Sequence, residues 1–112
     1  MIAYYECSQL GQAMPRVTEV EIGEAVLAIC ANTANGECSI ADLKAEIPNY
    51  IDLSADDRIQ SVTRPNEEMW EQQVRNLISH RTTPGNIICD GYAEYTGNAI
   101  RITDAGRRHV RG

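Results

Sequence analysis

The stretch Asn66–Arg81 reads NEEMWEQQVRNLISHR, and it restricts the fold more than any other part of the chain. Apolar residues recur along it at helical spacing and define one buried face, made by Trp70, Val74, Leu77 and Ile78. Asn66 is a favourable N-cap, and glutamates crowd the first turns, where the helix dipole favours negative charge. We therefore predict a helix from about Glu67 to Arg81, ended by Pro84-Gly85.

The opposite face of this predicted helix is polar and carries no acidic residue. Successive residues of a helix turn by about 100°, which places four side chains on one continuous stripe: Gln72, Arg75, Asn76 and Ser79. In the DNA major groove, arginine pairs with guanine, asparagine and glutamine pair with adenine, and serine contacts several bases. The stripe predicts base contacts, and an ordinary solvated helix face is the alternative interpretation.

A first helix is predicted upstream, from about Glu19 to Thr33. Thr18 and Glu21 form a capping-box pattern, and the apolar residues that follow recur on one face. Asn35-Gly36 favours a left-handed residue at a helix end, so we expect this helix to end there.

The next segment is predicted to hold a short strand and a short helix. Glu37–Ile40 reads as extended, and Ser39 is a favourable cap for a helix over Ile40–Ile47. The polar stretch Asn49–Asn66 is long for a turn. Within it, Leu53–Asp57 has the pattern of another cap followed by one or two helical turns.

Two strands and a final helix are predicted after the helix over residues 67–81. Asn86–Tyr95 and Ala99–Thr103 have the composition of strands. The sequence Thr96-Gly97-Asn98 between them favours a tight turn, so we expect a β-hairpin. Thr103 then opens a terminal helical segment that is rich in arginine.

This order of elements predicts an α+β fold of the winged helix-turn-helix type, with a three-helix core, a C-terminal β-hairpin wing and a short terminal helix. We assign residues 18–112 to this domain and residues 1–17 to an N-terminal tail or arm. In helix-turn-helix domains the second helix of the motif enters the major groove. The predicted helix over residues 67–81 is therefore the expected recognition helix.

Further DNA contacts are expected around this helix. A wing commonly touches phosphate or the minor groove, which makes Asn98 and Arg101 of the hairpin candidates. Arg64, His80 and Arg81 flank the recognition helix and are candidates for contact with the DNA backbone. The arginines of the terminal segment fit two interpretations equally, as phosphate contacts or as a helix-end cluster that the dipole favours.

Charge is distributed unevenly along the chain. The net charge is −6, which taken alone argues against a nucleic-acid binder. Residues 1–57 hold two basic and ten acidic residues, whereas residues 58–112 hold eight arginines and six acidic residues. The basic excess therefore coincides with the predicted recognition helix and hairpin, where it serves either to contact phosphate or to pair with the acidic half.

The sequence carries no recognisable catalytic or metal-binding constellation. The four cysteines form no C-x-x-C pair, and neither histidine lies at zinc-ligand spacing from them. Nuclease chemistry of the restriction type would need clustered carboxylates with a lysine, and Lys44 is the only lysine. We expect reduced and largely buried thiols, with Cys7 exposed, and no cofactor, metal or enzymatic activity in this chain.

Three stretches resemble a known family. Residues 69–80 (MWEQQVRNLISH), Gly85–Ile88 (GNII) and Ile100–Arg107 (IRITDAGR) resemble the winged-helix domain at the start of Mrr-type restriction system proteins, and similar domains attached to HNH nucleases. In that family a tryptophan-bearing helix leads into a wing that closes on an I-T-x-x-G-R signature. The resemblance implies binding of double-stranded DNA and targeting of a nuclease domain or subunit, in some systems to modified bases.

The resemblance has limits. The polar stretch Ser79–Gly85 is longer than the turn that precedes the wing in the family, and the sequence contains no nuclease domain, so cleavage is not expected. Two other functions fit the sequence: a homodimeric transcription regulator, and a protein-interaction winged helix that does not bind DNA. No apolar run is long enough to span a bilayer and no signal peptide is recognisable, which predicts a cytoplasmic protein without membrane contact.

Overall fold

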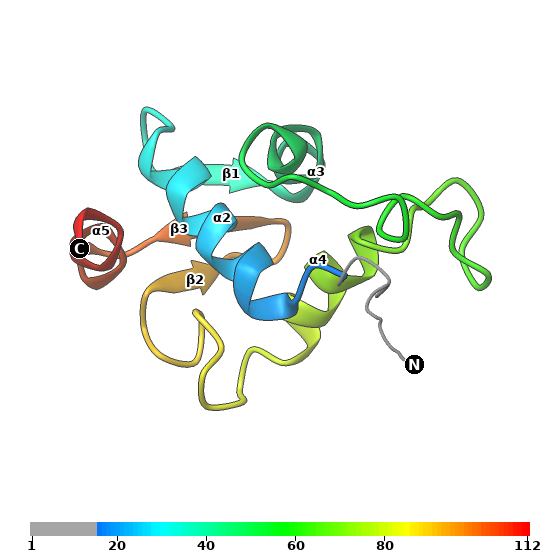
Figure 1. The fold of residues 1–112 in the computed structure, drawn as a ribbon. Helices are drawn as coiled ribbons and strands as arrows, with labels where there is room; N and C mark the ends of the chain where they lie inside the picture. Colours follow the sequence, from blue (N-terminus) through cyan, green and yellow to red (C-terminus); the bar gives the residue numbers. More distant parts are fainter. Residues whose placement is uncertain (1–15) are drawn as a thin grey trace, which may run out of the picture.

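The computed structural model describes residues 16–112 (Figure 1). In this part the chain forms an α+β fold, as predicted, whose elements follow in the order α2 (Glu19–Ala31), β1 (Glu37–Ser39), α3 (Ile40–Glu46), a 3₁₀ turn η2 (Ile47–Asn49), α4 (Glu71–Ser79), β2 (Ala93–Tyr95), β3 (Ala99–Ile102) and α5 (Asp104–Arg111). No helix of residues 16–112 is long and apolar enough to cross a membrane.

The predicted hairpin is confirmed and forms two strands of a three-stranded antiparallel sheet in the order β1-β3-β2. Ile100 and Ile102 point into the core, whereas Arg101 between them is exposed, as strand alternation requires. The turn is closed by a bond from the Thr96 amide to the Ala99 carbonyl of 2.9 Å. Gly97 takes a φ of +106°, which favours glycine at this position of the turn.

Helix α2 is the centre of the fold and lies across the sheet, with α4 on one side and α5 on the other (Figure 1). Its predicted capping box is present, because Thr18 accepts from the Glu21 amide and Glu21 accepts from the Thr18 amide. The predicted end is wrong: α2 stops at Ala31, and Gly36 (φ +75°) instead turns the chain into β1, where its carbonyl accepts from the Ile102 amide at 2.9 Å.

The predicted start of the recognition helix at Glu67, capped by Asn66, is wrong. Helix α4 begins at Glu71, and Asn66 lies in a left-handed turn with a φ of +66°. The reason is competition for backbone hydrogen bonds, because residues 67–70 pair antiparallel with residues 57–61. The Ser61 amide donates to the Glu67 carbonyl (2.7 Å), and the Met69 amide donates to the Ile59 carbonyl (2.8 Å).

The predicted helical turns over Leu53–Asp57 are reduced to a single turn with no helix after it. Ser54 and Asp57 still make the reciprocal bonds of a cap, at 3.0 and 3.2 Å. The second oxygen of the Asp57 carboxylate accepts from the Val17 amide at 2.9 Å, and Asp57 is 2% exposed. This side chain therefore connects the start of α2 to the segment of residues 50–70 between η2 and α4, which we call the insertion.

The predicted strand Asn86–Tyr95 is wrong except for its last three residues, which form β2. The Asn86 side chain explains the difference, because it donates to the Leu77 carbonyl (2.9 Å) and accepts from the Ile88 amide (2.8 Å). These bonds hold residues 86–91 in turns. Ile87 is thereby buried over Gly23 of α2, where an added Cβ would lie 3.1 Å from Ile87 Cγ2.

The core is mostly aliphatic, with Trp70 as its aromatic member, and includes two of the cysteines. Cys30 and Cys38 are free and buried, as predicted, and the Cys30 thiol donates to the Ile100 carbonyl at 3.4 Å. Burial is the main cause that raises the pKa of Cys30 to about 12, and burial also raises the pKa of Cys38. Both side chains are therefore neutral core residues. Cys89 is exposed.

The predicted N-terminal tail or arm of residues 1–17 lies almost wholly outside the described residues, as does the prediction of an exposed Cys7. Val17 is described, and it is a buried member of the hydrophobic core. The last residue assigned to the arm therefore packs with the domain.

Candidate nucleic-acid interface

Helix α4 is fixed in the fold by its apolar face. Val74 and Leu77 are buried, Ile78 is partly buried against the core, and Trp70 just before the helix is 4% exposed, which confirms it as a core residue. The Trp70 indole donates to the Glu68 carboxylate at 2.9 Å. Because this face is packed against α2, the predicted stripe lies on the side of α4 that faces away from the core.

The four stripe residues lie together on α4, but the insertion that precedes the helix holds two of them. Gln72 donates to the Ser61 hydroxyl at 2.9 Å. Arg75 forms a salt bridge with Glu67. The Asn76 side chain donates to the Gln73 side chain of the same helix at 3.3 Å, its one side-chain hydrogen bond among the described residues. Ser79 is exposed. The C-terminal half of the stripe therefore makes no side-chain hydrogen bond to another described element, and its last residue is exposed.

Lys44 of α3 is a residue of this surface that the sequence did not single out. Its ammonium group lies 3.5 Å from Glu67 and 3.7 Å from Glu71. Glu67 thus uses one carboxylate oxygen for Arg75 and the other for Lys44. The sequence signal was weak, because Lys44 lies on a separate short helix and its acidic partners follow much later in the chain.

These charged groups surround an open hollow of about 610 Å³ between α3, α4 and the loop over residues 63–67. Lys44, Arg64 and Arg75 are its cations, and Glu67 and Glu71 are its carboxylates. Arg64, which was predicted to contact the DNA backbone, is exposed at the rim and makes no salt bridge within residues 16–112. The hollow therefore offers one more positive than negative side chain.

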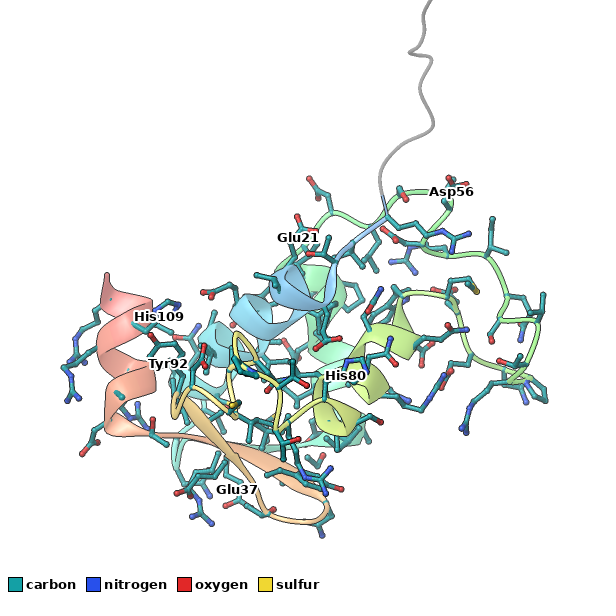
Figure 2. The ribbon with its side chains drawn as sticks, turned by 90° about the horizontal axis from the view of Figure 1, so that it is seen from below. Glu21, Glu37, Asp56, His80, Tyr92 and His109 are labelled. Atoms are coloured by element: carbon teal, nitrogen blue, oxygen red, sulfur yellow. The ribbon has the colours of Figure 1, made fainter. Side chains whose placement is uncertain are left out.

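The C-terminal end of α4 lies beside the end of the hairpin. Arg81 donates to the Ile78 carbonyl at 2.8 Å, and its guanidinium carbon lies 5.5 Å from the centre of the Tyr95 ring of β2. His80, at the C-terminal end of α4 (Figure 2), instead contacts Glu19 of α2 at 2.8 Å. Of these two candidate backbone contacts, Arg81 thus lies between α4 and the hairpin, whereas His80 lies against α2.

The hairpin presents its two candidates differently. Asn98 is exposed in the turn, and its carbonyl accepts from the Ile40 amide at 3.4 Å, which places the turn at the start of α3. Arg101 lies on the exposed face of the sheet between two carboxylates, 3.3 Å from Glu37 and 3.2 Å from Glu94. Arg101 would have to leave both carboxylates to hold a phosphate.

The arginines of α5 lie at the other end of the sheet from α4 (Figure 1). This helix docks through Gly106 and through His109, which stacks on Tyr92 at 4.4 Å and contacts Glu24 at 2.9 Å (Figure 2). The three arginines of α5 make no salt bridge with any described carboxylate; they are Arg107, Arg108 and Arg111. Arg108 and Arg111 are exposed, whereas Arg107 is half-buried and its guanidinium lies close to Gly36 before β1.

No family model, curated protein or solved structure matches this chain. What the α4 surface binds is therefore inferred from the residues that form it.

Proposed function

We propose that residues 18–112 form a winged-helix domain that binds double-stranded DNA, with α4 as the recognition helix and the β2–β3 hairpin as the wing. The observation that carries this proposal is the arrangement of the elements. From α2 to β3 the elements follow in the order helix, strand, helix, helix and two strands, and the sheet order is β1-β3-β2. In this arrangement the C-terminal end of α4 lies beside the end of the β2–β3 hairpin. This is the pair of elements that such domains present to a duplex.

The side chains on this surface support base reading at its C-terminal half. Asn76 and Ser79 carry the donors and acceptors that base edges match, and within the described residues neither side chain makes a hydrogen bond to another element. Arg75 and Gln72 extend the stripe once they release Glu67 and Ser61. Backbone contact is assigned to the flanking candidates Arg64, Arg81, Asn98 and Arg101, whereas His80 would first have to leave Glu19 of α2.

A duplex titration tests the proposal. The chain should bind a duplex of about two helical turns, with an affinity that falls steeply between about 50 and 200 mM salt; three phosphate contacts would give a logarithmic slope of about −3. The double variant Arg75→Ala/Asn76→Ala should weaken binding at least about tenfold, because it removes two stripe contacts and leaves Glu67 facing the DNA. Fluorescence anisotropy measures both quantities.

The matched control is Arg111→Ala, which removes one positive charge from α5 at the other end of the sheet. It should change the affinity less than about twofold. Absence of binding at about 50 mM salt would reject the proposal. An equal loss in Arg111→Ala would show that α4 is not the contact surface.

A protein-interaction module is the second candidate, and one observation favours it. Arg75 and Arg101, two of the cations on the predicted DNA-binding side, are each paired with carboxylates, and the chain has a net charge of −6. Such a surface suits a basic protein partner better than a polyanion. A chain that fails to bind the duplex at low salt fits this candidate.

A narrower proposal rests on the resemblance to Mrr-type domains. It makes this domain the targeting part of a restriction-type system, with a nuclease domain or subunit as partner and base modification as the signal. Titration with methylated and unmethylated duplexes of one sequence tests the last point, because equal affinities would reject it. The alternative of a homodimeric transcription regulator has a second copy of this chain as its partner in place of a nuclease. The mass of the DNA-free protein in solution distinguishes it, because the regulator would have the mass of a dimer.

A further inference from the structure

The hollow beside the N-terminal half of α4 brings together cations from three separate segments. Lys44 comes from α3, Arg64 from the insertion and Arg75 from α4. Lysine and arginine side chains repel one another unless an anion lies between them. In this structure the Glu67 carboxylate lies between two of them, with one oxygen on Arg75 and the other on Lys44, and Glu71 lies 3.7 Å from Lys44 at the edge of the same group.

Glu67 occupies this position in a partly desolvated setting. Its side chain is 12% exposed, and those of Lys44 and Arg75 are 29% and 32% exposed. The Glu67 backbone is held by the Ser61 amide, so rotation about the side-chain bonds alone can withdraw the carboxylate. A phosphodiester also presents two anionic oxygens, and it can contact the same two cations.

We propose that this hollow is a phosphate subsite, in which Lys44, Arg64 and Arg75 hold one phosphodiester of the DNA backbone and Glu67 is the internal anion that this phosphate displaces. The inference rests on the proposed DNA-binding function. It adds Lys44 to the DNA-binding residues, moves Arg75 from base reading to contact with the DNA backbone, and makes Glu67 a negative determinant of affinity. It also accounts for the position of the Glu67 carboxylate between two cations of the proposed DNA-binding surface.

The test is duplex binding by Glu67→Gln, measured by anisotropy at about 50 mM salt. The amide keeps the shape of the side chain and one acceptor for Arg75, but it removes the competing charge. Binding should tighten about tenfold, because the phosphate no longer displaces an anion. The double variant Lys44→Ala/Glu67→Gln should return to about the affinity of the unmodified chain.

Glu68→Gln is the matched control, since Glu68 is the neighbouring carboxylate and pairs with Arg58 outside the hollow. It should tighten binding less than about twofold. Thermal melting of each variant verifies folding, and Lys44→Ala alone, which should weaken binding, tests the subsite without changing Glu67.

The outcomes separate the two proposals. Tighter binding by Glu67→Gln than by Glu68→Gln, with loss of the gain in the double variant, supports the subsite. Equal affinities of Glu67→Gln and Glu68→Gln, or an unchanged affinity of Lys44→Ala, overturn the subsite and leave DNA binding standing. Failure of every variant to bind the duplex overturns both.

Discussion

Replacing Gly106 with alanine should destabilise the domain by about 3 kcal/mol, although alanine is the better helix former. Gly106 is the buried residue of α5 and lies where this helix packs against Tyr92 and Ile102. A Cβ added there would overlap the Tyr92 carbonyl oxygen and lie 2.7 Å from Ile102 Cγ1. Because the first of these neighbours is backbone, the helix itself has to move away.

The displacement should also separate the contacts that α5 makes elsewhere. The stack of His109 on Tyr92 and the contact of His109 with Glu24 both depend on the position of this helix. For a domain of this size, a loss of about 3 kcal/mol lowers the melting temperature by about 15 °C. Thermal unfolding followed by circular dichroism measures this shift.

Gly91→Ala is the control for the Gly106 experiment. Gly91 has a φ of +86° but no atom within 4 Å of an added Cβ, so only the left-handed backbone opposes the substitution. Its expected cost is about 1 kcal/mol. A Gly106→Ala variant that melts at or above the temperature of the unmodified chain would contradict the close packing of α5.

Replacing Asp57 with alanine should lower the free energy of unfolding by about 3 kcal/mol, an effect as large as that of Gly106→Ala. Its carboxylate accepts from the Val17 amide at 2.9 Å and from the Ser54 amide at 3.0 Å, and it is 2% exposed. Removal of both acceptors leaves two buried amides without partners. Chemical denaturation gives the free energy of unfolding, and the effect should appear as a lower midpoint.

Asp56→Ala is the control for charge, because Asp56 (Figure 2) is the adjacent acidic residue, and no side-chain hydrogen bond joins it to another residue of 16–112. It should change stability by less than about 0.5 kcal/mol. Asp57→Asn should fall between the two alanine variants, since one oxygen remains to accept. Equal denaturation midpoints for Asp56→Ala and Asp57→Ala would contradict the proposal that the hydrogen bonds of Asp57 to the Val17 and Ser54 amides stabilise the fold.

The parts of the fold that local sequence encodes were predictable. Thr18 and Thr103 cap α2 and α5 through bonds to residues three positions on, and Gly97 serves a turn between strands that pair directly. The buried face of α4 follows from its helical period alone. In each case the residues that interact lie within a few positions of one another, so their spacing is visible in the sequence.

The parts that failed depend on contacts between distant residues. Nothing near Glu67 shows that its carbonyl accepts from Ser61, and this bond prevents an earlier start of α4. The Asn86 side chain similarly replaces a strand by turns. For the candidate site, the stripe was visible from its period, but its pairing with Glu67 and the approach of Lys44 were not. The partner of Arg75 is Glu67, which belongs to residues 58–112, the half of the chain with the basic excess, and not to the acidic first half.

The central claim is that the chain contacts double-stranded DNA through α4 and the hairpin. The most direct measurement is an amide-resolved NMR titration of the chain with a duplex at about 50 mM salt. The proposal predicts that the amides of Asn76, Ser79 and Gly97 shift together, while those of Arg108 and Arg111 on α5 remain in place. Shifts confined to α5, or no shifts at a large excess of duplex, would contradict it.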